Sequence, residues 1–283
     1  KMLATKPIKK VVYGLVDPNP LVSGKGIQIL RDAGIEVEEF LGFSEELEML
    51  CEHFLFNFRE KKTWVSLKIA SSLDGIFAHE SGGSHWITDD VSREIGQVLR
   101  ASHDGILVGS QTLLTDDPQL NVRVEGLKHK NLKVFVLDPR GIALNKAGNL
   151  NVSRAHAKEN LFFITANSFN NIDLERQFNV IKAGPWDGEA HSQLLNLDEV
   201  LTSLWSIGVR SLYVEGGGFT LSSFIQQKKA QRMYLFQAPI ILGSKSGKSW
   251  SSQVNIKGID ERIALKSLQT FKLHSDLLMT GKF

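Results

Sequence analysis

Four charged side chains and one glycine-rich turn carry the chemistry that this sequence supports. Arg100 and Arg123 suit a phosphate group, because a guanidinium offers paired N–H donors in a fixed plane. Lys68 lies on the polar side of an alternating segment, and Glu215 comes directly before Gly216–Gly218. Glycine lets the backbone N–H groups of such a turn approach an anion closely. This set predicts a pocket for a small anionic ligand.

Each of these residues also has a structural explanation, and the sequence leaves both open. An arginine at the end of a helix, as predicted for Arg100, complements the helix dipole. Glu215 is equally consistent with a solvated acid or a partner of a helix N-terminus, and Trp86 with core packing. Glycine-rich turns between a strand and a helix also occur without a ligand, and this one lacks the G-x-G-x-x-G pattern of a dinucleotide fold.

Composition restricts the class of protein. The chain has 283 residues, of which 42% are hydrophobic and 23% charged, and its net charge is +2. We therefore expect no nucleic-acid partner, since no broad basic field is present. No apolar run is long enough to span a bilayer, and one cysteine, Cys51, excludes an internal disulfide. These features favour a cytoplasmic protein with no membrane partner, although the chain begins at Lys1 and its natural start is left open.

The elements that must position these residues form an α/β pattern. Thr63–Ala70 alternates, with Val65, Leu67 and Ile69 predicted on one face and Trp64, Ser66 and Lys68 on the other. Asp89–Arg100 is predicted as a helix that Thr88 caps, with Val91, Ile95, Val98 and Leu99 buried. Further strands are predicted at 106–109, 132–138, 161–165, 211–215 and 233–238, a helix at 198–208, a loop at 145–160, and a C-terminal hairpin around 274–276.

The first sixty residues predict a short β-loop-α-β unit. Strands are expected at 10–16 and 35–40, with a helix at 26–33 that stops before Gly34. Ser44–Lys61 has the spacing of one amphipathic helix that starts at Ser44 and carries Cys51 on its apolar stripe. We place a domain boundary after this helix, which gives domains 1–61 and 62–283.

Several motifs in order resemble a known family. They are Lys68–Gly75, Ser84–Thr88, Arg100-Ala101, Asp104–Gly109, Asp116–Arg123 and Val214–Gly217. Together they resemble the reductase domain of the bifunctional riboflavin-biosynthesis deaminase/reductases, from about Trp64 to the C-terminus. Asp17–Gly26 is similar to the last part of the deaminase domain of the same family. The resemblance implies a dihydrofolate-reductase-like, mostly parallel sheet with flanking helices, preceded by a partial cytidine-deaminase-like α/β segment.

The resemblance also implies an activity and its residues. It implies NADPH-dependent reduction of 5-amino-6-(5-phosphoribosylamino)uracil, a phosphorylated pyrimidine, to the 5-phosphoribitylamino compound by a homodimer or larger homo-oligomer. Substrate contacts are implied at Ser84, Arg100, Leu120, Arg123 and Glu215, and Lys68 and Thr88 match positions that line the pocket. Cofactor contacts are implied at Ala70, Trp86, Thr112, Asp116, Gly217, Gly218, Phe219, Thr220, Leu221, Ser222 and Ser223. Lys68, Asp116 and Glu215 are the candidates for catalysis, and Pro139 departs from a family position that is usually small and polar.

The zinc chemistry of the deaminase half is not expected in this chain. A zinc deaminase needs two cysteines beside a third ligand and a His-x-Glu shuttle, whereas this chain has one cysteine and no histidine two residues before a glutamate. We expect no metal site here, and zinc only in a deaminase portion outside the chain. Two other functions stay open: a different dihydrofolate-reductase-like reductase of a pterin or pyrimidine, and a non-catalytic nucleotide-binding subunit.

Overall fold

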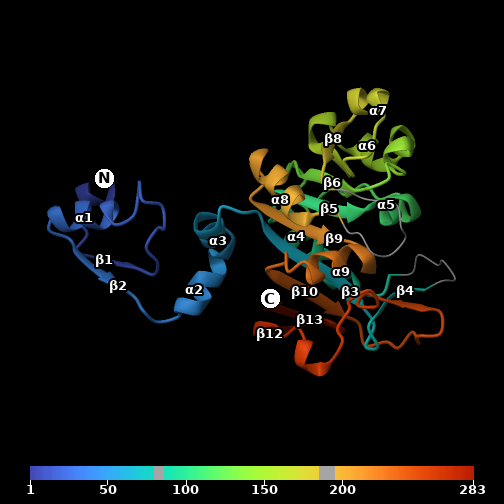
Figure 1. Cartoon of the computed structure of the whole chain (residues 1–283). Coiled ribbons are helices and arrows are strands. Elements are labelled where there is room, and N and C mark those ends of the chain that lie inside the picture. Colours follow the sequence, from blue (N-terminus) through green and yellow to red (C-terminus); the bar gives the residue numbers. More distant parts are fainter. Residues whose placement is uncertain (80–85, 185–194) are drawn as a thin grey trace. The chain divides into compact units, whose positions relative to one another are not determined.

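The computed structural model describes residues 1–79, 86–184 and 195–283, and its chain divides into two compact units (Figure 1). The first unit is Lys1–Lys62 and the second is Thr63–Phe283, so the division falls one residue beyond the boundary that the sequence suggested. The second unit carries every candidate site residue.

The first unit contains one pair of parallel strands and three α-helices. Its elements are η1 (Leu3–Thr5), β1 (Lys10–Tyr13), α1 (Lys25–Asp32), β2 (Glu36–Glu39), α2 (Ser44–Leu50) and α3 (Glu52–Glu60), with α1 between the paired strands. The prediction of one helix from Ser44 to Lys61 is wrong. The backbone leaves helical geometry at Cys51, where φ is −113° and ψ is 11°, and the Cys51 side chain is exposed instead of buried.

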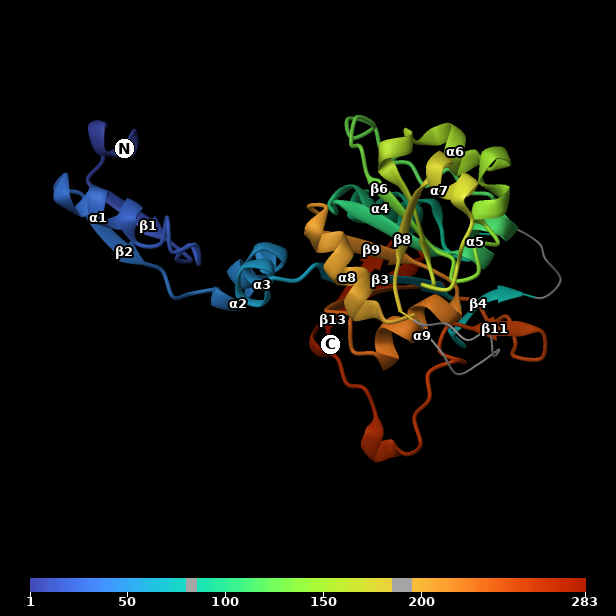
Figure 2. The same cartoon turned by 45° about the horizontal axis from the view of Figure 1, so that its top comes forward.

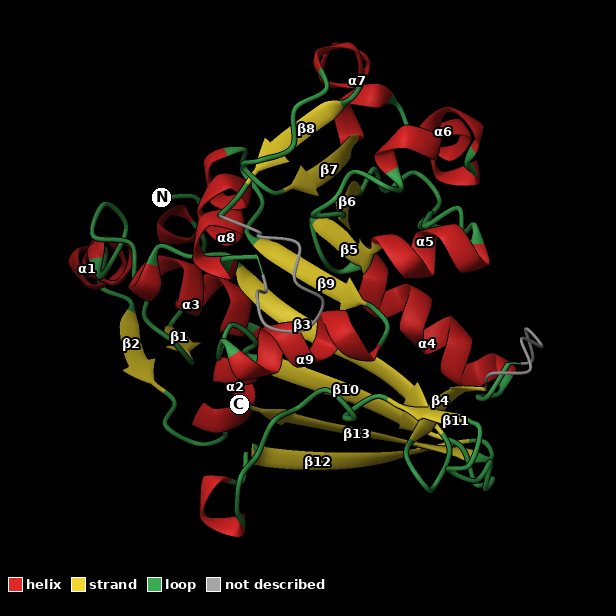
Figure 3. Cartoon of the chain, turned by 45° about the vertical axis from the view of Figure 1, so that its right-hand side comes forward, coloured by secondary structure: helices red, strands yellow, loops and turns green. Residues whose placement is uncertain are grey.

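A nine-stranded sheet organises the second unit. Its order is β12-β13-β10-β3-β9-β5-β6-β7-β8, and Figure 3 shows the hairpin of β12 and β13 at one edge. Seven neighbouring strands run parallel, and the hairpin is antiparallel, which confirms the predicted fold class. The strands are β3 (Trp64–Ser71), β5 (Gly105–Gly109), β6 (Lys133–Leu137), β7 (Leu161–Thr165), β8 (Asn179–Lys182), β9 (Ser211–Glu215), β10 (Arg232–Gln237), β12 (Lys266–Leu273) and β13 (Asp276–Lys282).

Helices cover both faces of this sheet, and each face has its own apolar core. On one face, α8 (Leu197–Ser206) and α9 (Gly218–Gln226) pack on Val65, Leu67 and Ile69 of β3, as the alternation of that strand predicts (Figure 2). On the other face lie α4 (Asp90–Ala101), α5 (Ser110–Asp116) and the segment of η2 (Leu144–Asn149) and α6 (Asn151–Ala155). The helical turns of that segment replace the loop predicted at 145–160.

The remaining elements are short. They are η3 (Lys158–Asn160), α7 (Ile172–Gln177), η4 (Ile259–Glu261) and a two-stranded sheet of β4 (Ile76–His79) with β11 (Gly247–Ser249). Among the residues that the structure describes, no helix is long and apolar enough to cross a lipid bilayer.

Helix α4 is turned differently from the prediction. Val91 and Val98 are 41% and 40% exposed, whereas Arg100 is only 8% exposed. The buried face carries Ser92, Gly96 and Arg100, spaced four residues apart. The face of α4 that is turned to the sheet therefore differs from the apolar stripe that the sequence predicts, and it carries the Arg100 side chain inward.

Candidate functional site

The centre of the site is formed by two adjacent parallel strands, β3 and β9. Lys68 pairs with Glu215 in the strand register, and Ser66 pairs with Tyr213. Because side chains alternate along a strand, these four residues project from the same face of the sheet. That face is the one that α4 covers. The sheet thus brings together a lysine and a glutamate that lie far apart in the sequence.

Arg100 and Glu215 form a two-pronged ion pair. Arg100 Nε donates to Glu215 Oε1 at 2.8 Å, and Nη2 donates to Oε2 at 3.0 Å. Arg100 Nη1 donates to the Asn121 carbonyl oxygen at 2.7 Å. Although burial opposes ionisation of the Glu215 carboxyl, the charges of Arg100 and Lys68 outweigh it and hold its pKa below the ordinary value. Glu215 is therefore a carboxylate at neutral pH, and the bonds of Arg100 to Glu215 and to the Asn121 carbonyl use three of the five N–H donors of that guanidinium.

Lys68 lies beside this ion pair without joining it. Its ammonium makes no hydrogen bond or salt bridge to the residues that the structure describes, and Nζ lies 6.0 Å from the centre of the Phe236 ring. Burial lowers the pKa of Lys68, with a further contribution from the charge of Arg100, while Glu215 opposes the shift. A lysine of lowered pKa with open hydrogen-bonding capacity is the strongest proton donor in this group.

A buried polar layer that the sequence did not predict lies on the same face of the sheet as Lys68. His103 Nε2 and Ser66 Oγ lie 2.9 Å apart, and Trp64 Nε1 donates to Ser66 Oγ at 3.0 Å. Tyr213 is fully buried, its ring centre lies 5.0 Å from that of His103 with the two planes tilted by 37°, and its hydroxyl has no hydrogen-bond partner among the described residues. Burial raises the pKa of the Tyr213 phenol well above its ordinary value. In the sequence, the signal that could have pointed to Tyr213 is its position two residues before Glu215 on the same strand.

The segment after α5 forms one wall of the site. Leu120 has a φ of 56°, and its buried side chain belongs to the apolar core on the α4 face of the sheet. Asp117 Oδ1 accepts a hydrogen bond from the Asn151 amide at 2.8 Å, which fixes the start of the segment. The Arg123 side chain is exposed, and its charge contributes to lowering the pKa of Glu215. Arg123 therefore lies within electrostatic reach of the ion pair.

The glycine turn lies at the carboxyl end of β9 and opens α9. A side-chain carbon at Gly216 would come 2.7 Å from Thr220 Cβ, and one at Gly218 would come 3.2 Å from the Ser249 carbonyl oxygen. Among the described residues, a side-chain carbon at Gly217 would meet only Thr112 Oγ1, at 3.6 Å. Gly216 and Gly218 are thus required by packing, whereas Gly217 leaves space in front of the helix N-terminus. That space and the free N–H groups of the first helical turn fit a phosphate of a dinucleotide.

The other residues predicted around the turn differ in how far their side chains are exposed. Phe219 is 52% exposed, but Thr220, Leu221, Ser222 and Ser223 have buried side chains, so those four can reach a ligand only through backbone atoms. Leu221 belongs to the apolar core under α9. The Ala70 side chain is partly buried at a position of β3 that pairs with Phe236 of β10.

The Trp86–Thr88 segment is held by the first turn of α4. Trp86 is 72% exposed, which rules out core packing, and the Arg93 guanidinium lies 4.9 Å from its ring centre. Arg93 Nη1 donates to the Thr88 carbonyl oxygen at 2.7 Å, and the same guanidinium pairs with Asp90. The helix cap is Asp89, which accepts from the Ser92 amide, and not Thr88 as predicted.

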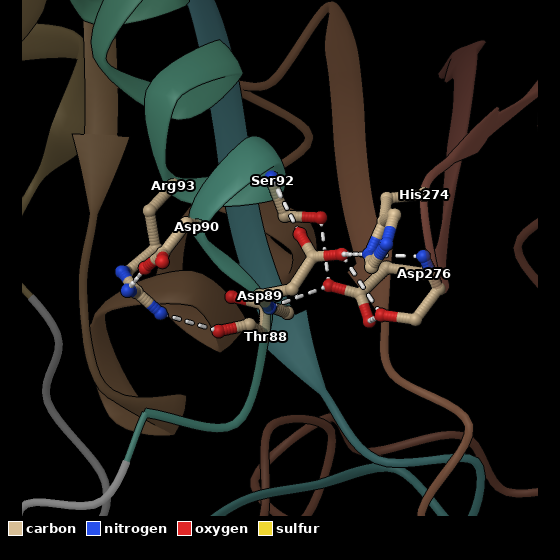
Figure 4. A network of polar contacts seen from close by, with 8 residues as sticks. Thr88, Asp89, Asp90, Ser92, Arg93, His274 and Asp276 are labelled. Carbon is tan, nitrogen blue, oxygen red and sulfur yellow. Dashed lines mark hydrogen bonds and ion pairs between the residues drawn. The ribbon is translucent and has the colours of Figure 1, made fainter.

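A carboxylate pair ties this helix start to the C-terminal hairpin (Figure 4). Asp89 Oδ2 accepts from Ser275 Oγ at 2.8 Å and lies 3.3 Å from His274 Nδ1. Asp276 Oδ2 accepts from the Asp89 amide at 2.8 Å and from Ser92 Oγ at 2.7 Å. Partial burial opposes ionisation of Asp89, but the hydrogen bonds from Ser92 and Ser275 hold its pKa far below the ordinary value. The network positions the segment that carries Trp86.

Two predicted residues are not placed with the central group. Asp116 is exposed at the last position of α5, and loss of hydration there raises the pKa of its carboxyl. Ser84 lies outside the described residues. The structure thus brings together Lys68, Arg100 and Glu215, with Arg123 in electrostatic reach. Among the described residues, no group of three or more histidine, cysteine or acidic side chains could hold a metal ion.

Comparisons with known proteins agree with this architecture. The profile of the RibD C-terminal domain matches residues 63–279. The riboflavin biosynthesis protein RibD of Bacillus amyloliquefaciens is 32% identical over 281 residues, covering 99% of this chain and 73% of that protein. The structure of Acinetobacter baumannii RibD superposes with a TM-score of 0.78 at 28% identity, covering 100% of this chain and 75% of the other.

A second solved structure comes from Thermotoga maritima and is described as a diaminohydroxyphosphoribosylaminopyrimidine deaminase/5-amino-6-(5-phosphoribosylamino)uracil reductase. It superposes with a TM-score of 0.77 at 29% identity, and the match covers 99% of this chain and 73% of that chain. The chain spans about three quarters of the length of these relatives. The profile match and the RibD relatives together show that the chain belongs to the RibD C-terminal domain family.

Proposed function

We propose that the chain is an oxidoreductase that reduces 5-amino-6-(5-phosphoribosylamino)uracil to its ribitylamino product with NADPH. The RibD relatives and the reductase named for the Thermotoga maritima structure support the reaction. The observation that carries it is the meeting of Lys68, Arg100 and Glu215 next to a glycine turn at the carboxyl end of a parallel strand. Substrate sites of open α/β sheets lie at that edge.

The reaction needs a hydride, a proton and a dry, oriented site. When bound, NADPH would supply a hydride for the ribose C1′ carbon. The bond from C1′ to the ring oxygen would then break, and that oxygen would take up a proton from the enzyme to become a hydroxyl. Lys68 is our candidate donor for that proton, because its ammonium has a lowered pKa and no hydrogen-bond partner among the described residues. Glu215 is ionised, so we assign it to holding the substrate instead of donating a proton.

Residues of this chain fit the cofactor at the glycine turn. Gly217 leaves the space that a pyrophosphate needs, Thr112 borders it, and Phe219 offers an exposed ring. The exposed Trp86 is a candidate wall for the nicotinamide, and the Arg93 guanidinium over its ring holds the indole in place. The choice of NADPH over NADH belongs to this proposal, as does the role of Asp116 as a cofactor contact.

Three further assignments complete the proposal. Residues 1–61 correspond to the last part of a deaminase domain, whose zinc site would lie in residues outside this chain. The enzyme acts in the cytoplasm as a homodimer or larger homo-oligomer. Its ligands are small molecules, and we assign it neither a nucleic-acid nor a membrane partner.

Steady-state oxidation of NADPH tests the proposal. We expect turnover with the phosphorylated ribosylaminouracil, and none without it or with dihydrofolate in its place. Turnover with dihydrofolate alone would favour the pterin reductase. NADPH binding without turnover of any pyrimidine would favour the non-catalytic nucleotide-binding subunit.

A further inference from the structure

Asp74 joins the turn that follows β3 to the segment that follows β10. Its Oδ2 accepts a hydrogen bond from the Gly243 amide at 2.7 Å, and its Oδ1 accepts one from the Leu242 amide at 3.2 Å. Beside them, the Leu73 amide donates to the Ile240 carbonyl oxygen at 2.9 Å. One exposed carboxylate thus fixes two successive backbone amides of a segment that lies far from it in the sequence.

The Asp74 carboxylate is itself held by a buried side chain. Ser72 Oγ donates to Asp74 Oδ1 and accepts from the Ile76 amide at 3.0 Å. The hydrogen bond from Ser72 lowers the pKa of Asp74 most; loss of hydration opposes the shift, and the amides of Gly243 and Leu242 add to it. Asp74 is therefore ionised at neutral pH and links the end of β3 to the other segment.

The two joined segments continue as one antiparallel ribbon of β4 and β11. Ile76 lies opposite Ser249 in the register, and the Trp250 amide donates to the Gly75 carbonyl oxygen at 3.4 Å. A side-chain carbon at Gly247 would come 2.8 Å from Ile76 Cγ2, so the two strands pack closely. The β4–β11 ribbon follows the carboxyl ends of β3 and β10, at the edge of the sheet that carries the glycine turn (Figure 1, Figure 3).

The β4–β11 ribbon lies directly against the first residue of α9. A side-chain carbon at Gly218 would come 3.2 Å from the Ser249 carbonyl oxygen, 3.3 Å from the Trp250 carbonyl oxygen and 3.6 Å from the Phe77 ring. Both strands of the ribbon thus contribute to this contact. Because the backbone has no room to move toward the ribbon, the ribbon determines where α9 begins. It thereby fixes the N–H groups that face the space at Gly217.

We propose that Asp74 is a positioning residue for NADPH, because it holds the β4–β11 ribbon against the glycine turn. The inference rests on the cofactor site of the proposed function and adds a residue outside that site on which the affinity depends. Asp74 acts through the backbone of Leu242 and Gly243 and then through the ribbon. A turn that is fixed before the cofactor arrives loses less conformational freedom on binding, which strengthens binding.

Steady-state kinetics of Asp74→Ala test the inference. We expect the KM for NADPH to rise at least about fivefold, the order of one net hydrogen bond. The KM for the pyrimidine and kcat should stay within about twofold of the parent values, as for a surface substitution. A purely structural role would act differently: it would lower kcat with the fraction of folded enzyme and leave both KM values unchanged.

Two further variants complete the kinetic test. Asp74→Asn keeps one acceptor oxygen, so its KM for NADPH should lie between those of the parent and Asp74→Ala. The control is Asp173→Ala, which removes the same charge from an exposed position of α7 and should leave all constants unchanged. An unchanged KM for NADPH in Asp74→Ala, or an equal rise in the KM of both substrates, overturns the inference.

Hydrogen–deuterium exchange of the parent chain tests the same link without a substitution. Saturating NADPH should slow amide exchange in residues 72–79 and 240–250 as well as in the glycine turn, and Asp74→Ala without NADPH should exchange faster in 240–250. Protection that is confined to the glycine turn, or absent altogether, contradicts the inference. If both regions are protected but NADPH is not oxidised with any pyrimidine, the proposed reaction fails while the role of Asp74 stands.

Discussion

Lys68 and Glu215 face each other across two hydrogen-bonded strands, and both have lowered pKa values for different reasons. Burial disfavours the charge on Lys68, whereas the neighbouring cations favour the charge on Glu215. The two groups therefore have separate tasks at neutral pH. Glu215 remains a fixed negative charge, and Lys68 is a cation that gives up its proton more readily than a lysine in water.

Lys68→Gln should lower kcat by roughly 10²- to 10⁴-fold, the usual contribution of a general acid, with little change in either KM. In the parent enzyme, kcat should fall as pH rises through the Lys68 pKa, which lies below its ordinary value of 10.5. This alkaline decline should be absent from the variant. Lys266→Gln, on the exposed strand β12, is the control, and an unchanged pH profile in Lys68→Gln would remove the proton-donor assignment.

The ion pair of Arg100 and Glu215 should be strongly coupled. Removing one partner leaves a buried charge, so Arg100→Met should cost roughly 3–5 kcal/mol of unfolding free energy in urea. Glu215→Gln leaves the Arg100 guanidinium without its counter-charge, and the double variant should lose less than the sum of the two single changes. Additive losses would show that the pair is not a unit. The sequence contains both residues, but no pattern in it predicts that they contact each other.

The turn from β9 into α9 contains one glycine that packing requires, Gly216, and one that we assign to cofactor binding, Gly217. Gly217→Ala should keep the stability of the parent, because its new methyl group meets only Thr112 Oγ1 at 3.6 Å. It should raise the KM for NADPH several-fold by filling the space before the helix N-terminus. Gly216→Ala should instead lower the Tm, since its methyl group would come 2.7 Å from Thr220 Cβ.

Gly148→Ala is a matched change with no neighbouring atom within 4 Å, and it should alter neither Tm nor KM. If the Gly217→Ala enzyme binds NADPH as tightly as the parent, the cofactor does not bind at this turn. Thermal unfolding and NADPH titration of the parent and the three glycine variants measure the Tm and the affinity for NADPH on the same samples.

The link between α4 and the C-terminal hairpin predicts a pH dependence of stability. The Asp89 carboxyl has a folded-state pKa far below its unfolded value of about 3.9, so its stabilisation is present above that value and is lost as pH falls toward the folded pKa. Asp89→Asn retains a capping side chain but removes this charge. Its stability should decline less than that of the parent between about pH 5 and pH 2, and parallel curves of Tm against pH would contradict this role.

Local patterns predicted the elements better than their orientation. The alternation of β3 and the hairpin around 274–276 follow from neighbouring residues, and the structure confirms both. The rotation of α4 does not, because Arg100 is buried against Glu215, a residue 115 positions away, while Val91 and Val98 stay exposed. The Asp89 cap and its bond to Asp276 join residues 187 positions apart, a distance over which no local spacing rule operates.

At the scale of the whole molecule, the larger unit contains all the chemistry that we assign. Its sheet is buried on both faces, so the polar groups that remain at its carboxyl edge have a rigid frame. The resemblance in the sequence predicted the family and its fold. It did not predict that Arg100 is engaged by Glu215, because a motif gives the identity of residues and not their partners.

The central claim is that hydride from the cofactor reaches the ribose C1′ beside Lys68. Reduction of the phosphorylated ribosylaminouracil with NADPH that carries deuterium at the transferred C4 position tests it most directly. Mass spectrometry and NMR of the product should show one deuterium per molecule, bonded to C1′, with one NADPH oxidised for each product formed. Oxidation of NADPH without deuterium at C1′, or at the same rate when the pyrimidine is omitted, would contradict the account.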